Sequence, residues 1–252
     1  SMTLVDKKLF NNKAHYLGRP ADFDTKFIRW RVEFLKEDKE FINQDKTLID
    51  IGCGNGATLF GINNDFKELK GVDINATHQS VFENYAKENL VTNCSFEVLN
   101  IEKENYPKQY DRLTSFEVIE HLDDDNNVKK YLELLKDDGI AIFSVPNKWW
   151  IFETHGANLP LLPWNRVPFF SWLPTFIHER FANARIYTKK RFINLLERNG
   201  YEILEVKYMT APMDVLKKDT WFKRFLTGYI FKNKETTNPF LAVSIYVKAK
   251  KA

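Results

Sequence analysis

Thr47-Leu-Ile-Asp-Ile-Gly-Cys-Gly-Asn-Gly-Ala-Thr-Leu-Phe60 is the stretch that decides the fold. It opens with a short apolar, β-branched run typical of a buried strand, and glycines follow at alternate positions before a second apolar run. Glycines permit a sharp turn and the close approach of a ligand to the backbone. A helix starting there would direct its unpaired N–H groups at that ligand. The stretch therefore predicts a strand, a cofactor-binding turn and a helix.

The glycine pattern alone fits two kinds of cofactor. Gly52-x-Gly54-x-x-Ala57 satisfies the loose dinucleotide pattern, which keeps an NAD-binding oxidoreductase open. Asp50, at the end of the expected strand, would repel a pyrophosphate but suits the ammonium group of S-adenosylmethionine. Asp73 ends the next apolar run, where doubly wound folds place a ribose-binding carboxylate. The two carboxylates together favour S-adenosylmethionine.

Two motifs, Asp50-Ile-Gly-Cys-Gly-Asn-Gly56 and Gly71-Val-Asp73, resemble those of the class I S-adenosylmethionine-dependent methyltransferases. The resemblance runs from about Thr47 to Tyr208. It implies an α/β fold, a Rossmann-like seven-stranded and mostly parallel sheet with helices on both faces. Asn100 stands where the family usually has an acidic residue near the adenine amino group, and an amide oxygen can accept the same hydrogen bond. The implied cofactor-binding residues are Asp50, Gly52, Cys53, Gly54, Gly56, Asp73, Ile74, Asn100, Ile101 and Phe116.

A second stretch, Glu117-Val-Ile-Glu-His121, follows the expected strand Tyr110–Phe116 and lies where ligands bind in an open α/β sheet. If this segment turns as a helix, Glu117, Glu120 and His121 share one side and offer oxygen and imidazole ligands to a divalent metal. Two other interpretations stay open. His121 can serve as a general base without a metal, or the glutamates can be solvated and the histidine a packing residue.

The Glu-x-x-Glu-His pattern resembles ubiquinone-pathway catechol O-methyltransferases and small-RNA 2′-O-methyltransferases, which methylate hydroxyls with the help of a divalent metal. That resemblance implies Mg²⁺, Mn²⁺ or Zn²⁺. Glu153-Thr-His155 resembles a segment of polysaccharide-associated methyltransferases, which implies that His155 completes the metal site or acts as base; His178 is the alternative. The expected catalytic residues are His121, His155 and Glu117, and the expected metal ligands are Glu117, Glu120, His121 and His155.

We expect one domain over residues 1–252, made of an N-terminal helical cap, a cofactor-binding core, an aromatic-rich insertion after the fifth strand, and C-terminal helix and strands. The insertion faces the substrate or forms a satellite core under a long loop. A basic and aromatic segment in the C-terminal part lies on an anionic membrane, holds an anionic substrate, or packs as an amphipathic helix. The respective ranges are 1–45, 46–146, 147–186 and 187–252, with the basic-aromatic insertion at 210–238.

Composition narrows the partners. The 37 basic and 34 acidic residues leave a net charge of +3, which is too balanced to favour nucleic acid. No apolar run approaches the roughly 18 residues that a membrane span needs. The two cysteines and the lack of a signal-like N-terminus predict a cytoplasmic protein, with peripheral membrane contact as an option.

The expected function is transfer of a methyl group from S-adenosylmethionine to a hydroxyl of a sugar, glycan or nucleotide-sugar, assisted by a divalent metal. A ubiquinone-pathway-like catechol and an RNA 2′-hydroxyl are alternative acceptors. An NAD-binding oxidoreductase and an inactive cofactor-binding module are the alternatives of another class. The sequence does not predict an oligomeric state.

Overall fold

The computed structural model describes residues 23–152, 168–182, 184–213 and 220–252. Within them the chain forms one eight-stranded sheet in the order β3-β2-β1-β4-β5-β8-β6-β7. The strands are β1 (Asn43–Ile51), β2 (Phe66–Asp73), β3 (Cys94–Val98), β4 (Tyr110–Phe116), β5 (Leu135–Pro146), β6 (Tyr201–Thr210), β7 (Glu235–Thr236) and β8 (Ala242–Lys251). The helices are α2 (Lys26–Glu37), α3 (Ala57–Ile62), α4 (Thr77–Glu88), α5 (Tyr131–Leu134), α6 (Thr175–Phe181), α7 (Lys189–Arg198) and α8 (Trp221–Phe225).

The sheet is mixed. Strands β3, β2, β1, β4 and β5 pair in parallel, whereas β8, β6 and β7 add to β5 in antiparallel pairs. The α/β Rossmann-like fold is thus confirmed, but the expected seven strands are one too few. The extra strand, β7, is two residues long and pairs at the edge with Tyr208 and Met209 of β6. So short an edge strand has no apolar run that would reveal it in the sequence.

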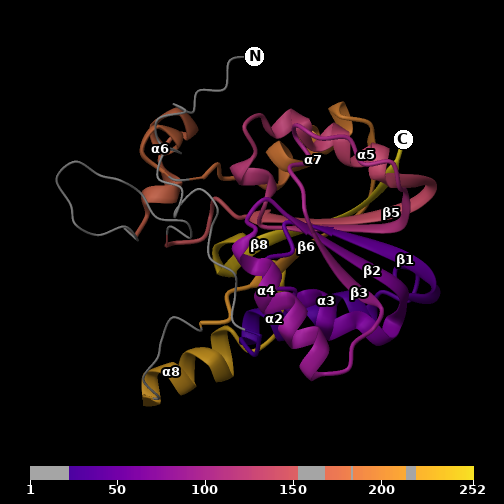
Figure 1. The fold of residues 1–252 in the computed structure, drawn as a ribbon. Helices are drawn as coiled ribbons and strands as arrows, with labels where there is room; N and C mark the ends of the chain where they lie inside the picture. The colour runs from indigo at the N-terminus through magenta and orange to yellow at the C-terminus, as the bar shows by residue number, and fades with distance from the viewer. Residues whose placement is uncertain (1–22, 153–167, 183, 214–219) are drawn as a thin grey trace.

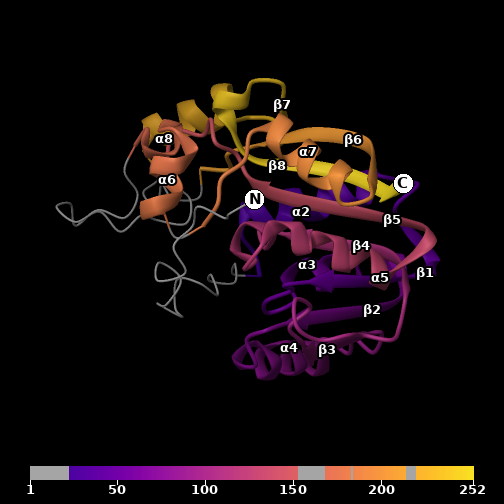
Figure 2. The same cartoon turned by 90° about the horizontal axis from the view of Figure 1, so that it is seen from above.

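Helices cover both faces of the sheet, with α5 and α7 on one side and α2, α3 and α4 on the other (Figures 1 and 2). Alternate side chains of β5 divide between two cores. Phe143 and Val145 join the core under α5 and α7, whereas Ile140 and Ile142 join the core under α2, α3 and α4. We call these the α7 core and the α2 core. Strands buried on both faces explain why the sequence shows continuous apolar runs there.

Of the expected helical cap over residues 1–45, residues 1–22 lie outside the described residues, and the rest includes α2, which packs on the sheet face through the α2 core. Thr25 caps it by accepting a hydrogen bond from the Ile28 amide. Phe34 is buried and its ring lies 5.1 Å from that of Tyr246 on β8. The sequence predicts Phe82, Tyr85 and Val81 of α4 against the sheet, and Val81 is instead 45% exposed, whereas Phe82 is buried. The described helices include none with the length and apolarity of a membrane span.

Candidate active site

The glycine turn joins β1 to α3 as predicted. Gly52, Gly54 and Gly56 all have positive φ, at 74°, 54° and 86°, a region that side chains other than glycine rarely adopt. A Cβ placed on Gly52 would stand 2.3 Å from Cγ2 of Val118. The turn therefore lies directly against the segment from Glu117 to His121, and a cofactor held by the turn would adjoin that segment.

Asp73 ties the turn to the end of β2. Its Oδ2 accepts a hydrogen bond of 2.9 Å from the Gly54 amide, and its Oδ1 accepts one of 2.9 Å from the Asn75 amide. Ile74 beside it is 44% exposed. Each carboxylate oxygen can accept a second hydrogen bond, so Asp73 can also bind a ribose hydroxyl.

Asn100 and Ile101 follow β3 and begin a turn. The Asn100 side-chain oxygen accepts a hydrogen bond of 3.0 Å from the Glu102 amide, and Ile101 is buried in the α7 core. An amide oxygen has two lone pairs, so Asn100 keeps capacity for an adenine amino group. Cys53, within the glycine turn, is half-buried, and burial raises the pKa of its thiol well above the ordinary value.

Asp50 is buried at the end of β1, and its Oδ1 accepts a hydrogen bond of 2.7 Å from the Thr114 hydroxyl. Burial raises the pKa of Asp50 to about 7. The Thr114 hydrogen bond and the positive charge of Arg31 oppose that rise, and the charge of Asp73 adds to it. Asp50 is therefore a carboxyl whose charge depends on its surroundings near neutral pH.

Arg31 lies beside the candidate site, and no motif in the sequence points to it. It lies on α2 with its side chain buried, and its Nε donates a hydrogen bond of 3.3 Å to the Tyr246 hydroxyl. Its guanidinium lies 4.7 Å from the centre of the Phe116 ring at the end of β4. The spacing along the helix could have revealed that Arg31 is buried. Arg31 falls four residues after Phe27 and three before Phe34, on the apolar face of the helix.

Glu117 turns away from the direction that a helix would give it. Its φ is 57°, and its Oε1 accepts hydrogen bonds of 3.0 Å from the Ser144 hydroxyl and 2.7 Å from the Ser244 hydroxyl. Burial raises the pKa of Tyr246, and the charge of Glu117 adds to that rise. Because Tyr246 belongs to the α2 core, Glu117 lies toward that face of the sheet.

Glu120 lies toward the other face. It is fully buried, and its Oε1 is 3.9 Å from Nε2 of His121. Burial raises the pKa of Tyr131, and the charge of Glu120 is among the smaller effects that add to that rise. Tyr131 belongs to the α7 core, so Glu117 and Glu120 diverge to opposite faces.

The described residues do not support the expected metal site, and the full set of expected ligands is not tested because it includes His155. Among those residues no three or more His, Cys, Asp or Glu side chains are grouped so that they can hold a metal ion. The positive φ of Glu117 separates it from Glu120 and His121, which remain together. His155 lies outside the described residues. His178, the alternative to it, is buried on α6 with its ring 5.2 Å from that of Phe170.

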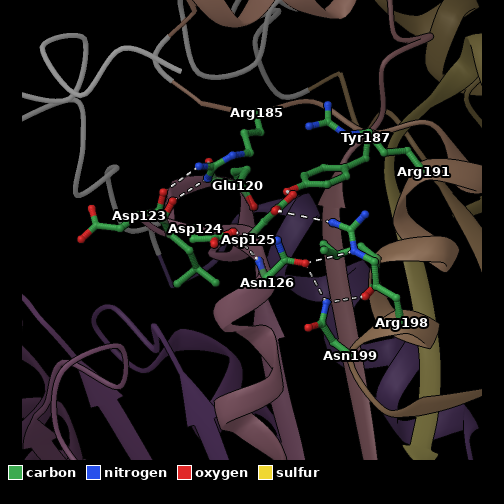
Figure 3. A network of polar contacts seen from close by, with 12 residues as sticks. Glu120, Asp123, Asp124, Asp125, Asn126, Arg185, Tyr187, Arg191, Arg198 and Asn199 are labelled. Atoms are coloured by element: carbon green, nitrogen blue, oxygen red, sulfur yellow. Dashed lines mark hydrogen bonds and ion pairs between the residues drawn. The ribbon is translucent and has the colours of Figure 1, made fainter. Parts of the chain in front are cut away.

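A polar network that includes Glu120, Asp123 and Arg185 holds the segment after β4 (Figure 3). The buried guanidinium of Arg185 donates hydrogen bonds of 2.5 Å to the Leu122 carbonyl and 2.9 Å to the Asp123 carbonyl. The Arg185 amide donates one of 3.2 Å to the Glu120 carbonyl. Tyr187, two residues after Arg185, donates a hydrogen bond of 3.1 Å from its hydroxyl to Oδ2 of Asp125. The network joins the segment after β4 to the residues that precede α7.

Comparison with known proteins identifies the family. Residues 22–206 match the methyltransferase domain family. The chain belongs to the methyltransferase domain family. That range includes β1 to β5 with the glycine turn and the Glu117–His121 segment, so the candidate site falls within the family's own domain. The resemblance to class I S-adenosylmethionine-dependent methyltransferases is confirmed.

Curated relatives of this methyltransferase include ubiquinone biosynthesis O-methyltransferases. That of Pelagibacter ubique is 27% identical over 161 residues, covering 60% of this chain and 63% of the relative. That of Serratia proteamaculans is 30% identical over 120 residues, covering 45% of this chain and 49% of the relative. The chain thus spans less than two thirds of the length of either relative.

Solved methyltransferase structures share the fold. A coclaurine N-methyltransferase bound to N-methylheliamine and S-adenosylhomocysteine superposes with a TM-score of 0.64 at 15% identity, over 98% of this chain and 81% of the other. A geranyl diphosphate C-methyltransferase from Streptomyces coelicolor, bound to Mg²⁺, geranyl diphosphate and S-adenosylhomocysteine, gives a TM-score of 0.59 at 16% identity, over 88% and 80% of the chains. Between these two structures one fold serves nitrogen and carbon acceptors, so the fold alone does not decide the acceptor atom.

Proposed function

We propose that the chain transfers the methyl group of S-adenosylmethionine to a hydroxyl oxygen. The observation that carries this proposal is the contact between the glycine turn and the segment that bears Glu120 and His121. The turn supplies a place for the methyl donor, and the buried carboxylate beside an imidazole supplies a base at the adjoining position. A hydroxyl needs such a base, because it loses its proton when it attacks.

For the cofactor, we propose that Asp73 binds the ribose, that Ile74, Asn100 and Ile101 contact the adenine, and that the turn holds the methionine end. Arg31 is buried on the same face as Asp50 and Phe116, and its charge opposes the rise in the pKa of Asp50 that burial causes. A guanidinium is suited to a carboxylate partner. We therefore assign Arg31 to the methionine carboxylate, with Asp50 near the methionine ammonium.

For the reaction, we propose that the acceptor oxygen attacks the methyl carbon in line with the departing sulfur. The new O–C bond forms as the C–S bond breaks, and the sulfonium becomes the neutral thioether of S-adenosylhomocysteine. His121 takes the hydroxyl proton, and the Glu120 carboxylate at 3.9 Å stabilises the imidazolium that results. Glu117 lies on the opposite face, and we assign it to the cofactor side of the site rather than to proton transfer.

No step of this proposal passes through a metal, because the described residues do not fit a common site for one. The expectation of Mg²⁺, Mn²⁺ or Zn²⁺ rests on resemblance. The test of the proposed function compares turnover in EDTA with turnover after each metal is restored. We also propose a cytoplasmic location, which the free thiols of Cys53 and Cys94 support.

The acceptor we propose is a hydroxyl of a sugar, glycan or nucleotide-sugar. Phe169, Trp172 and Phe240 support it, because they form an exposed aromatic cluster next to Trp149 just after β5. The Trp172 ring centre lies 4.9 Å from that of Phe169 and 5.5 Å from that of Phe240. Exposed aromatic rings suit the apolar faces of sugars. A phenolic hydroxyl is the second candidate, which the names of the ubiquinone O-methyltransferases favour.

The test is release of S-adenosylhomocysteine from a panel of nucleotide-sugars, oligosaccharides, catechols, RNA 2′-hydroxyls and a secondary amine. Each acceptor is assayed with EDTA and then with Mg²⁺, Mn²⁺ or Zn²⁺ restored. Turnover on a hydroxyl class in EDTA is the expected result. Turnover confined to the amine would contradict hydroxyl transfer, and dependence on a restored metal would contradict the metal-free mechanism.

A further inference from the structure

Large aromatic side chains stand exposed along one helical segment, formed by α8 and the π-helical turn η6 (Leu226–Ile230) that continues it. Trp221 is 76% exposed, Tyr229 is 79% exposed, and Phe225 between them is 46% exposed. The three recur at a four-residue spacing, and the rings of Phe225 and Tyr229 lie 5.3 Å apart. We call Trp221, Phe225 and Tyr229 the aromatic stripe. Such a stripe is unfavourable in water and indicates a surface that meets an apolar phase.

The opposite side of the same segment is anchored. Leu226 packs against a small core of Trp150, Ala211, Met213 and Phe231. The Thr227 hydroxyl donates a hydrogen bond of 2.9 Å to the Lys223 carbonyl within the helix. The segment therefore has an inner face that the protein covers, and the stripe is its outer face. Exposure of the stripe follows from the packing of the segment.

Positive charge accompanies the stripe. Lys223 and Arg224 lie between Trp221 and Phe225, and Lys232 follows the helical segment. The sequence from Thr220 to Lys234 contains no acidic residue. Tryptophan and tyrosine concentrate where hydrocarbon meets water, and basic side chains near them attract anionic lipid headgroups. An anionic membrane surface offers hydrocarbon to the three rings and negative charge to the lysines and arginine at the same interface.

We propose that the aromatic stripe docks the protein on an anionic membrane surface. The stripe lies at the same end of the molecule as the candidate site. In both views α8 and α6 are at the end toward which β5 runs (Figures 1 and 2). On α6, Phe176 is 60% exposed, which extends the apolar surface at that end. Ligands bind at the carboxyl ends of parallel strands, so docking turns the candidate site toward the lipid.

The test is flotation of the full chain with vesicles of phosphatidylcholine alone or with roughly one third phosphatidylglycerol. We expect binding to the anionic vesicles and weaker binding to the neutral ones. Trp221→Ala with Tyr229→Ala lowers the partition coefficient by about tenfold or more, because two interfacial rings are removed. The matched control removes exposed apolar side chains elsewhere, with Val81→Ala and Leu90→Ala, and keeps wild-type binding.

A charge-reversal pair tests the electrostatic part. Lys223→Glu with Arg224→Glu lowers binding to anionic vesicles by about tenfold or more, whereas Lys189→Glu with Lys190→Glu makes the same change in net charge on α7 and leaves binding intact. Raising the salt from 0.1 to 0.5 M weakens wild-type binding because the charges are screened. Binding of S-adenosylhomocysteine at wild-type affinity shows that each variant is folded.

Three results would overturn the proposal. The first is that the wild type does not bind anionic vesicles, and the second is that the stripe variant binds them as well as the wild type does. The third is that the wild type forms a concentration-dependent dimer, which the stripe variant loses, and does not bind vesicles. The last result would assign the stripe to a second copy of the chain. None of these outcomes bears on methyl transfer to a water-soluble acceptor, so failure here is distinct from failure of the proposed reaction.

Discussion

Asp50 and Arg31 carry opposite charges into the same buried region, one from β1 and one from α2. Two effects compete at Asp50. Burial favours the neutral carboxyl, whereas the Thr114 hydrogen bond and the charge of Arg31 favour the carboxylate. Burial is the larger effect and sets the pKa near 7. The cofactor-free protein therefore keeps a carboxyl that is costly to ionise at the point where we place the methionine end of the cofactor.

The difference in the free energy of unfolding between Asp50→Asn and wild type should depend on pH, because Asp50 is costly to ionise. The native pKa of about 7 exceeds the unfolded value of about 3.9, so Asp50 stabilises the native state below about pH 4. That contribution is lost as the pH rises toward 7. The free energy of unfolding of Asp50→Asn relative to wild type should therefore rise by about 2–3 kcal/mol between pH 5 and 7.5. Urea unfolding of the cofactor-free proteins measures it, and a difference that is flat with pH would refute the shifted pKa.

Replacing Arg31 with Met should weaken S-adenosylhomocysteine binding by roughly 10- to 100-fold, because a charge-assisted contact with the methionine carboxylate is lost. Arg29→Met is the matched control, since Arg29 lies on the same helix but is exposed and pairs with Asp24. Calorimetric titration gives both affinities. Equal affinities for the two variants would remove Arg31 from the cofactor site.

At the scale of elements, the segment after β4 is held by a residue far along the chain. Arg185 precedes α7, yet it donates to carbonyls of Leu122 and Asp123 and its amide donates to Glu120. It touches none of the reacting groups and is a positioning residue for His121. The Leu122 carbonyl that it satisfies is buried with it, so the loss of that donor is costly.

Replacing Arg185 with Met should lower kcat by at least about tenfold while leaving the affinity for S-adenosylhomocysteine within about twofold, because the base shifts and the glycine turn does not. Arg185→Lys restores part of kcat, since one ammonium can still donate to two carbonyls. Arg198→Met is the control, from an exposed arginine at the edge of the same network. Parallel loss of kcat and cofactor affinity in Arg185→Met would show a general structural defect.

The sequence predicts elements where one local pattern suffices. The bounds of β4 agree with the expectation for Tyr110–Phe116, which is buried throughout. Thr188 caps α7 as its sequence context indicates. Glu117 does not share one side with Glu120 and His121 as expected, because its φ is positive and its backbone is not helical. Its carboxylate instead accepts hydrogen bonds from Ser144 and Ser244. Those serines come from strands remote in sequence, and spacing along the chain does not reveal them.

The same limit applies to the molecule as a whole. The contact between Arg31 and Tyr246 joins residues 215 apart, and β7 forms only because β6 offers a free edge to Thr236. The cofactor turn, in contrast, is local in sequence, and its residues predict it together with the two strand-end carboxylates Asp50 and Asp73. Local chemistry therefore reveals the cofactor, and tertiary contacts decide which residues face the acceptor.

The intact protein should show its cofactor preference as thermal stability. Saturation with S-adenosylhomocysteine at about 100 times its dissociation constant adds about 2.7 kcal/mol to the free energy of unfolding. For a chain of this size, that raises the melting temperature by roughly 5–10 °C. NAD at the same concentration should leave it unchanged. Calorimetric scans with each ligand test this, and a larger shift with NAD would contradict the assignment of the turn.

The most direct test of the account is single-turnover transfer of a labelled methyl group from S-adenosylmethionine to the best hydroxyl acceptor, by wild type and by His121→Gln. Loss of a general base costs about 10²- to 10⁴-fold. We predict a fall in transfer of at least about 100-fold for His121→Gln, with the affinity for S-adenosylhomocysteine within about twofold of wild type. Transfer by the variant at the wild-type rate would contradict the central claim that His121 takes the hydroxyl proton.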